Sequence, residues 1–163
     1  MKIDLRQLFD IVGERQTLER TLDFSKEEWY GGYPFQTPIQ VSGQIENKAG
    51  VVRFIFGVKF ALQLTCDRCL KVFERTFAYS FEHILVKSLN TDNDEFVVCE
   101  DSTLDLMDLI RADLFLELPV KVLCQEDCKG LCGQCGKNLN FDSCECEKQS
   151  IDPRLEVLSQ LLK

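Results

Sequence analysis

The sequence predicts an α+β protein in which an antiparallel β-sheet with a few short helices is followed by a small cysteine-rich zinc module. Three observations lead to this fold class. Apolar and polar residues alternate through residues 39–85, one amphipathic helical stretch ends before Pro119, and residues 124–146 hold six of the nine cysteines without strand or helix periodicity. We therefore expect an α+β core domain over residues 1–119 and a cysteine-rich metal module with a C-terminal helix over residues 120–163.

The strand signal begins at Ile39. Residues 47–50, with the sequence Asn-Lys-Ala-Gly, form a credible hairpin turn, and every second position over residues 52–66 is then apolar. Residues 66–69 reverse the chain, and period-two spacing of apolar residues resumes over residues 73–85. Because these segments follow one another through short turns, we expect them to pair in sequence as antiparallel neighbours.

Two helices are expected in the C-terminal half. Ser102 and Asp105 resemble a capping box, and the helix that follows should end before Pro119, with its acidic residues off its apolar face. The apolar face comprises Leu106, Met107, Ile110 and Leu114, and the acidic residues are Asp105, Asp108 and Asp113. A second helix should begin at Asp152, which is followed by a proline and a short leucine stripe. Residues 95–99 could add an edge strand.

The formal net charge of −8 is concentrated in one segment. Residues 90–119 carry a net charge of −8, whereas residues 1–89 carry +1 and residues 120–163 carry −1. Residues 48–75 are nevertheless locally basic, at +4, so the global acidity does not exclude a patch that faces RNA. The candidate RNA-binding residues are Lys48, Arg53, Lys59, Arg68, Lys71 and Arg75.

Several protein classes are disfavoured by what the sequence lacks. The first ten residues contain no apolar signal region, and no stretch approaches about 18 uninterrupted apolar residues, so we expect a cytoplasmic protein without a membrane partner. There is no phosphate-binding glycine loop and no G-x-S-x-G elbow. His83, the only histidine, follows the strand alternation and is expected to be a non-catalytic strand residue. We therefore expect no enzymatic activity and no small-molecule substrate.

The cysteine spacing predicts structural zinc. Two close pairs eight residues apart can place four thiolates around one Zn²⁺, and their glycines let the backbone turn tightly around the sulfurs. This first set is Cys132, Cys135, Cys144 and Cys146. A second four-thiolate site becomes available if the turn at residues 66–69 lies near the cysteine-rich segment. That second set is Cys66, Cys69, Cys124 and Cys128. One zinc ion is therefore expected, and two can be accommodated.

Other uses of these cysteines are open at this point. Cys124 or Cys128 could replace a member of the first set, and the pair Cys66 and Cys69 could be a hairpin turn with two packed or exposed thiols. Disulfides and reduced cysteines without metal are further alternatives, although a reducing cytoplasm favours thiolate–metal chemistry. A dithiol redox centre needs a thiol pair at a helix N-terminus after a strand, and neither pair precedes a helical pattern. Cys99 is expected to be a small buried hydrophobe.

Several motifs together are similar to those of one known family. They are the C-D-R-C turn at residues 66–69, the acidic D-L-M-D-L-I-R-A-D-L-F-L-E-L-P helix, the stretch L-C-Q-E-D-C-K-G-L-C-G-Q-C-G-K-N-L-N with C-E-C, and the closing I-D-P-R-L. Over roughly residues 38–162 the chain resembles the YceD family, the large ribosomal RNA subunit accumulation proteins of bacteria and plastids. It is similar to the Gram-positive form, which has the C-terminal cysteine module, except that Gln134 stands where proline is common.

The resemblance implies a non-enzymatic factor for accumulation or maturation of large-subunit ribosomal RNA. Its expected partner is that RNA or a pre-ribosomal particle. Some branches of the family keep the C-x-x-C turn but lack the C-terminal module, which implies that the module is not indispensable to the core role. One alternative is an acidic protein-binding module that holds a basic ribosomal protein, with the acidic helix segment as its contact surface. A second alternative is a dithiol redox factor.

Overall fold

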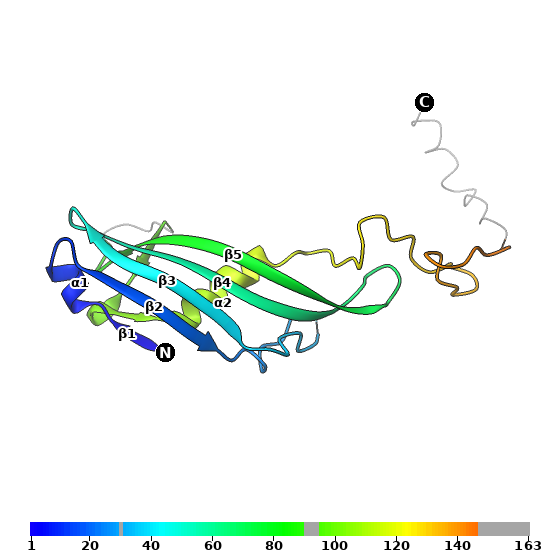
Figure 1. Cartoon of the computed structure of the whole chain (residues 1–163), viewed down its shortest axis with the longest axis horizontal. Coiled ribbons are helices and arrows are strands. Elements are labelled where there is room, and N and C mark those ends of the chain that lie inside the picture. The colour runs from blue at the N-terminus through cyan, green and yellow to red at the C-terminus, as the bar shows by residue number, and fades with distance from the viewer. Residues whose placement is uncertain (30, 90–94, 147–163) are drawn as a thin grey trace, which may run out of the picture.

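The computed structural model describes residues 1–29, 31–89 and 95–146. The molecule is elongated, with a curled β-sheet as its body and the cysteine-rich segment beyond one end of the two longest strands (Figure 1). The expected helix at Asp152 lies outside the described residues. None of the helices within the described ranges has the length and apolar character needed to cross a membrane.

Ten elements follow one another along the described residues. They are β1 (Lys2–Asp4), α1 (Arg6–Asp10), β2 (Arg15–Leu22), β3 (Ile39–Lys48), β4 (Val51–Thr65), β5 (Val72–Val86), β6 (Phe96–Val98), the 3₁₀ turn η1 (Glu100–Ser102), β7 (Thr103–Asp105) and α2 (Leu106–Glu117). Strands β2 to β6 form one five-stranded sheet in sequence order, and β1 pairs with β7 in a separate ribbon. The expected β3–β4 and β4–β5 hairpins are confirmed.

The expectation of a purely antiparallel sheet is wrong at one edge. Strands β2 to β5 are antiparallel neighbours, whereas β6 runs parallel to β5, with Ile84 opposite Phe96 and Val86 opposite Val98. The sheet is therefore mixed. An edge strand of three residues carries too little alternation to reveal its direction, so the sequence indicated its existence but not its orientation.

Helix α2 begins later than its capping pattern suggested. Its N-cap is Asp105, whose carboxylate accepts a hydrogen bond from the backbone N–H of Met107 at 3.0 Å. Ser102 instead lies in η1 with a φ of 55°, a left-handed conformation that is incompatible with an N-cap. The ammonium of Met1 also pairs with Asp105 at 2.9 Å, which ties β1 to the start of the helix.

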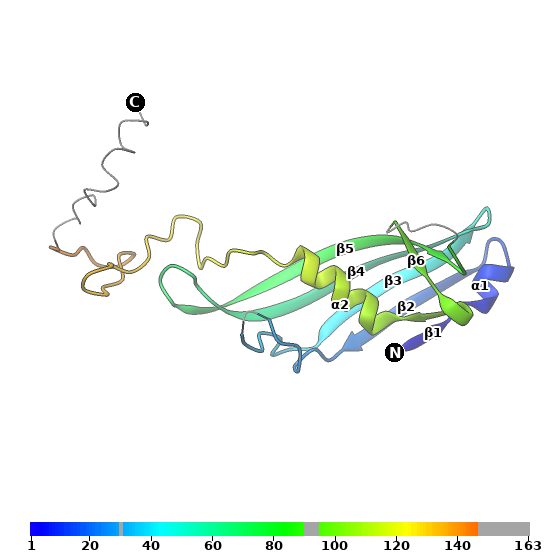
Figure 2. The same cartoon turned by 180° about the vertical axis from the view of Figure 1, so that it is seen from behind.

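One face of the sheet carries the core, and α2 lies against it (Figure 2). The even-numbered residues of β4 point inward, from Val52 at 2% exposure to Leu62 at 0%. The buried face of α2, which includes Leu106 and Ile110, belongs to the same cluster. Nearer the β4–β5 turn, the loop between β2 and β3 covers the core face of the sheet in place of α2. Phe35 of this loop packs on Phe60 with ring centroids 5.8 Å apart.

The prediction that Asp113 lies off the apolar face of α2 is wrong. Asp113 is only 9% exposed, and its carboxylate lies 2.8 Å from Nε2 of His83 on β5. His83 is on a strand, as expected, and it points inward in step with Leu85. A buried carboxylate needs a hydrogen-bonding partner, and the imidazole supplies one across the sheet–helix interface.

Gly43 marks the closest approach between β3 and β4. A Cβ atom at this position would lie 2.5 Å from Cβ of Phe56 and 2.6 Å from the carbonyl oxygen of Ile55, which no real side chain tolerates. Gly57, on the other face of the neighbouring strand, would meet only ordinary contacts of 3.6 Å or more. Of these two glycines, only Gly43 is therefore required by packing.

We expect Gly43→Ala to lower the free energy of unfolding by roughly 1–3 kcal/mol, because the added methyl group overpacks the β3–β4 interface. The matched control, Gly57→Ala, should change it by less than about 1 kcal/mol. Urea denaturation followed by far-UV circular dichroism measures both. Equal effects of the two substitutions would contradict the close approach at Gly43.

Candidate metal centres at the tip of the sheet

The structure brings the turn between β4 and β5 against the chain that follows α2. Their cysteines form a group that we call centre A, in which all four sulfurs lie within 4.8 Å of one another. The Sγ atoms of Cys66 and Cys128 are 3.8 Å apart, and those of Cys69 and Cys124 are 3.6 Å apart. A zinc tetrahedron with bonds of about 2.3 Å has edges of about 3.8 Å, so the spacing fits this ion.

A second group, which we call centre B, lies within the cysteine-rich segment itself. Its members are Cys132, Cys135, Cys144 and Cys146, and their sulfurs also lie within 4.8 Å of one another. The backbone N–H of Gly136 donates to the carbonyl of Cys132 at 2.9 Å, which closes a tight turn around the first pair. Cys135 is exposed and the other three are half-buried, so centre B is more open than centre A.

The hairpin turn of centre A forms a cysteine knuckle. The backbone N–H of Leu70 donates to the carbonyl of Cys66 at 2.9 Å, and the N–H of Cys66 donates to the carbonyl of Lys71 at 2.9 Å. Leu70 has a φ of 57°, which lets the chain turn away immediately after the second cysteine. Both thiols therefore point to the same side, towards the C-terminal chain.

Three side chains dock that chain onto the hairpin. The carboxylate of Asp67 accepts a hydrogen bond from the backbone N–H of Val122 at 2.6 Å. The guanidinium of Arg68 donates to the carbonyl of Cys128, and that of Arg75 donates to the carbonyl of Leu123, both at 2.6 Å. Arg75 also lies over the ring of Phe73, 5.2 Å from its centroid. These contacts bring Cys124 and Cys128 to the hairpin.

Two thiols of centre A, those of Cys66 and Cys124, have pKa values that are shifted in opposite directions. Burial raises the pKa of the Cys66 thiol, but hydrogen bonds from the backbone N–H groups of Cys124, Cys69 and Arg68 outweigh it and lower the pKa to about 6. Burial, followed by hydrogen bonds with the neighbouring thiols, raises the pKa of Cys124 to about 12. Four thiolates this close repel one another, so full ionisation needs a cation among them.

In centre B the pKa values of two thiols are likewise shifted in opposite directions. Hydrogen bonds from the backbone N–H groups of Cys135 and Gln134 lower the pKa of Cys132 to about 6. The hydrogen bond with Cys135, together with burial, raises the pKa of Cys146 to about 12. The chemistry of both groups therefore fits a divalent metal with affinity for sulfur.

Two of the alternative uses of these cysteines find no support in the geometry. All nine cysteines are free, and the measured sulfur separations are far longer than the disulfide bond of about 2.05 Å. Within the described residues neither C-x-x-C pair precedes a helix; Cys66 is fully buried, whereas Cys132 is half-buried and Cys135 is exposed. Cys99 belongs to neither group; it is buried in the main core, and burial raises its pKa to about 11.

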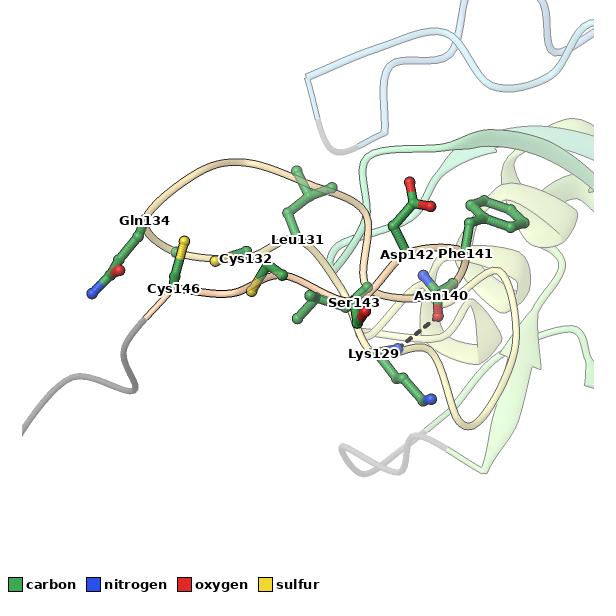
Figure 3. A pocket seen from close by; sticks show the side chains of 12 residues that line it. Lys129, Leu131, Cys132, Gln134, Asn140, Phe141, Asp142, Ser143 and Cys146 are labelled. Atoms are coloured by element: carbon green, nitrogen blue, oxygen red, sulfur yellow. Dashed lines mark hydrogen bonds between the residues drawn. The ribbon is translucent and has the colours of Figure 1, made fainter.

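A hollow of about 960 Å³ borders centre B. Phe141 and Asp142 point to one side of it, whereas Lys129 points to the other (Figure 3). Its charged groups therefore do not converge on a common point. A catalytic zinc needs an open coordination position, and each group offers four cysteine ligands, which suits a closed structural ion.

The six basic candidate residues are not brought into one patch. Lys48 and Arg68 lie beyond opposite ends of β4, roughly 50 Å apart along a strand of fifteen residues. Lys59 is on the uncovered face of the sheet, and so is Arg53, which pairs with Glu82 at 3.3 Å. Arg75 lies opposite Leu62 on the covered face. Lys71 is exposed at the hairpin tip beside Arg68.

Two residues of the centres escaped the sequence interpretation. Asp67 was counted only as an acidic residue, although it holds Val122. Asn140, the second asparagine of the N-L-N motif, directs its side-chain N–H at Sγ of Cys128 at a distance of 3.4 Å. The motif itself was a usable signal, because an asparagine between two knuckles is well suited to hydrogen-bond a thiolate.

The fold and these groups define a class of protein: a curled, mixed sheet whose longest hairpin carries one of two four-cysteine groups that could hold a metal ion. Comparison with known families agrees with the motifs. The model of the family described as "Large ribosomal RNA subunit accumulation protein YceD" matches residues 56–162. The chain therefore belongs to the YceD family.

Several relatives extend this comparison. A Bacillus subtilis (strain 168) protein described as uncharacterized protein YlbN is 31% identical over 130 residues, which cover 78% of this chain and 76% of the relative. The chloroplastic large ribosomal RNA subunit accumulation protein YCED homolog 1 of Arabidopsis thaliana is 26% identical over 160 residues, covering 79% of this chain and 50% of the relative. An uncharacterized protein of Mycobacterium tuberculosis (strain ATCC 25618 / H37Rv) is 40% identical over 72 residues, covering 44% and 34%. No solved structure matches the chain significantly.

We expect the protein, purified under reducing conditions, to contain two equivalents of zinc by elemental analysis. Cys69→Ser should remove the ion of centre A and Cys135→Ser that of centre B, leaving about one equivalent each, because three ligands bind structural zinc far more weakly than four. Cys99→Ala is the matched control and should keep both ions. Clearly fewer than two equivalents in the unmodified protein would contradict zinc at both centres.

Proposed function

We propose that this chain is a non-enzymatic factor for the accumulation of large-subunit ribosomal RNA, and that it acts in the cytoplasm by binding a pre-ribosomal particle. The observation that carries the proposal is membership of the YceD family, which is described as large ribosomal RNA subunit accumulation protein. The chloroplastic relative has the same description, but this chain spans only half of it, so its role is extended here as part of the proposal.

Both centres are assigned structural zinc ions in this proposal. Four thiolates and a near-tetrahedral spacing favour zinc over magnesium or calcium, which prefer oxygen ligands. Zinc would fix the C-terminal segment to the hairpin and stabilise the thiolate forms. Hydrogen bonds of Arg68 and Asp67 to the backbone of Cys128 and Val122 would position the docked chain around the ion.

The absence of catalysis is supported by the state of the titratable groups. His83 is engaged with Asp113 between β5 and α2 and does not border either centre. Cys66, whose pKa is lowered, is fully buried. Cys132, whose pKa is also lowered, lies half-buried among the other thiols of centre B, where we assign it to the structural ion.

Of the six basic candidate residues, we propose that three contact RNA: Lys48, Lys59 and Lys71. These side chains are exposed, and they have no ion pair among the contacts of the described residues. Arg68 and Arg75 are bound to backbone carbonyls of the docked chain, so they act first as structural cations. Phosphate contacts of this kind would position the protein without reading sequence.

A second candidate function, an acidic module that holds a basic ribosomal protein, is favoured by the total charge. The chain has a formal net charge of −8, and four thiolates outweigh the two charges of a zinc ion, so each loaded centre adds negative charge. The acidic surface differs from the expected one, because Asp113 is buried and Asp105 is paired with the N-terminus. Asp108 remains exposed beside Arg111.

Reversing the charge of Lys59 and Lys71 together should weaken association with pre-ribosomal particles, because phosphate repels the introduced carboxylates. We expect at least a tenfold loss of co-sedimentation in a sucrose gradient. The matched control is Lys2→Glu with Lys26→Glu, which makes the same change in net charge elsewhere. An unchanged profile for the Lys59 and Lys71 variant would contradict these residues as RNA contacts.

Nuclease treatment separates the two candidate partners. If RNA is the direct partner, digestion of the particles should release the protein, since the contact is made to phosphates. Retention on digested material, together with release when Asp108 and Glu117 are neutralised, would instead support the basic-protein partner. Affinity purification followed by mass spectrometry measures both outcomes.

A further inference from the structure

The two centres are connected through a single side chain, Asn140. Its amide N–H points at Sγ of Cys128 in centre A, at 3.4 Å, and its side-chain oxygen accepts a hydrogen bond from the backbone N–H of Lys129 at 2.8 Å. Asn140 thus holds both a ligand of centre A and the residue that follows this ligand. Cys128 itself is fully buried, so water does not replace the amide donor.

The position of Asn140 is set by the turn that belongs to centre B. Asn140 lies between the two cysteine pairs of that centre, and its backbone N–H and its amide donate to Oδ1 of Asn138 at 3.0 and 2.7 Å. Asn138 in turn forms an antiparallel backbone bridge with Leu131, the residue that precedes Cys132 of centre B. An unfolded turn at centre B would therefore leave Asn140 without its support.

The backbone makes a parallel connection. The N–H of Leu131 donates to the carbonyl of Arg68 at 3.1 Å, and the N–H of Leu139 donates to the carbonyl of Gly130 at 2.9 Å. Gly130 has a φ of 78°, and a Cβ atom there would lie 3.0 Å from the carbonyl oxygen of Arg68. The base of the centre B hairpin consequently rests on the knuckle of centre A.

We infer that Asn140 is an outer-sphere positioning residue of centre A, and that it makes the metal affinity of centre A depend on the metal occupancy of centre B. Metal at centre B orders the hairpin, and the ordered hairpin places the amide on the thiolate of Cys128. Hydrogen bonds to ligands typically change metal affinity by about 10- to 100-fold. Because binding energies are reciprocal, metal at centre A should strengthen centre B by the same factor. This inference rests on the proposed metal binding at both centres.

The test uses the full-length protein loaded with ¹¹³Cd, whose resonance reports each four-thiolate centre separately. Cys69→Ser and Cys135→Ser assign the two resonances. Competition with a chelator then gives the affinity of centre A in four proteins: unmodified, Asn140→Leu, Cys135→Ser, and the variant that combines the last two. The matched control is Lys137→Ala, a change in the same hairpin, because the Lys137 side chain has no hydrogen bond or ion pair among the described residues.

We expect Asn140→Leu and Cys135→Ser each to weaken centre A by about 10- to 100-fold, and the combined variant to be little weaker than either, because both remove the same interaction. Lys137→Ala should leave the affinity within about twofold of the unmodified protein. Additive losses, or an unchanged centre A in Asn140→Leu, would overturn the inference. If the unmodified protein binds fewer than two ions, the metal proposal itself fails instead, so the two failures are distinguishable.

Discussion

The convergence of four cysteines at centre A is the constraint on which the far end of the molecule depends. The buried cluster around Cys66, Cys69 and Cys128 is separate from the main core and includes only a few partly buried apolar neighbours, such as Phe73 and Leu131. So little apolar burial does not offset the entropy of ordering a hairpin tip and the chain after α2. The hydrogen bond that the Asp67 carboxylate accepts and those that Arg68 and Arg75 donate hold the geometry, and a metal ion would supply the missing stabilisation.

The long hairpin explains why the centre lies so far from the body. Strands β4 and β5 have fifteen residues each, and their inner faces are covered first by α2 and then by the loop that carries Phe24 and Phe35. Beyond Leu64 the apolar cover ends and the thiols take its place. The hairpin thus holds the C-terminal chain beyond the part of the sheet that α2 covers (Figure 2).

Features that depend on neighbouring residues in the sequence could be predicted, whereas those that depend on contacts between distant residues could not. Period-two alternation before Cys66 is local, so β4 and both hairpins could be predicted. Spacing alone suggested the cysteine set of centre B, whereas the set of centre A depended on a proximity that the sequence does not show. The contact between His83 and Asp113 could not be predicted, because the two residues lie thirty positions apart, but the burial of Asp113 was open to prediction. Asp113 lies seven residues after Leu106 and three after Ile110, on the helix face that is buried. The general preference of carboxylates for solvent wrongly outweighed that spacing.

Local charge along the sequence was a poor guide to a basic surface for a related reason. In a strand, neighbouring residues face opposite sides, so Arg75 and Lys59 lie on different faces although both belong to one locally basic stretch. The cations nearest the thiols also have an electrostatic reason to be there. A metal-loaded centre A would be anionic, so its burial would be unfavourable without compensation, and Arg68 and Arg75 bring positive charge to its edge. The basic character of the hairpin therefore reflects the needs of centre A before it reflects those of any partner.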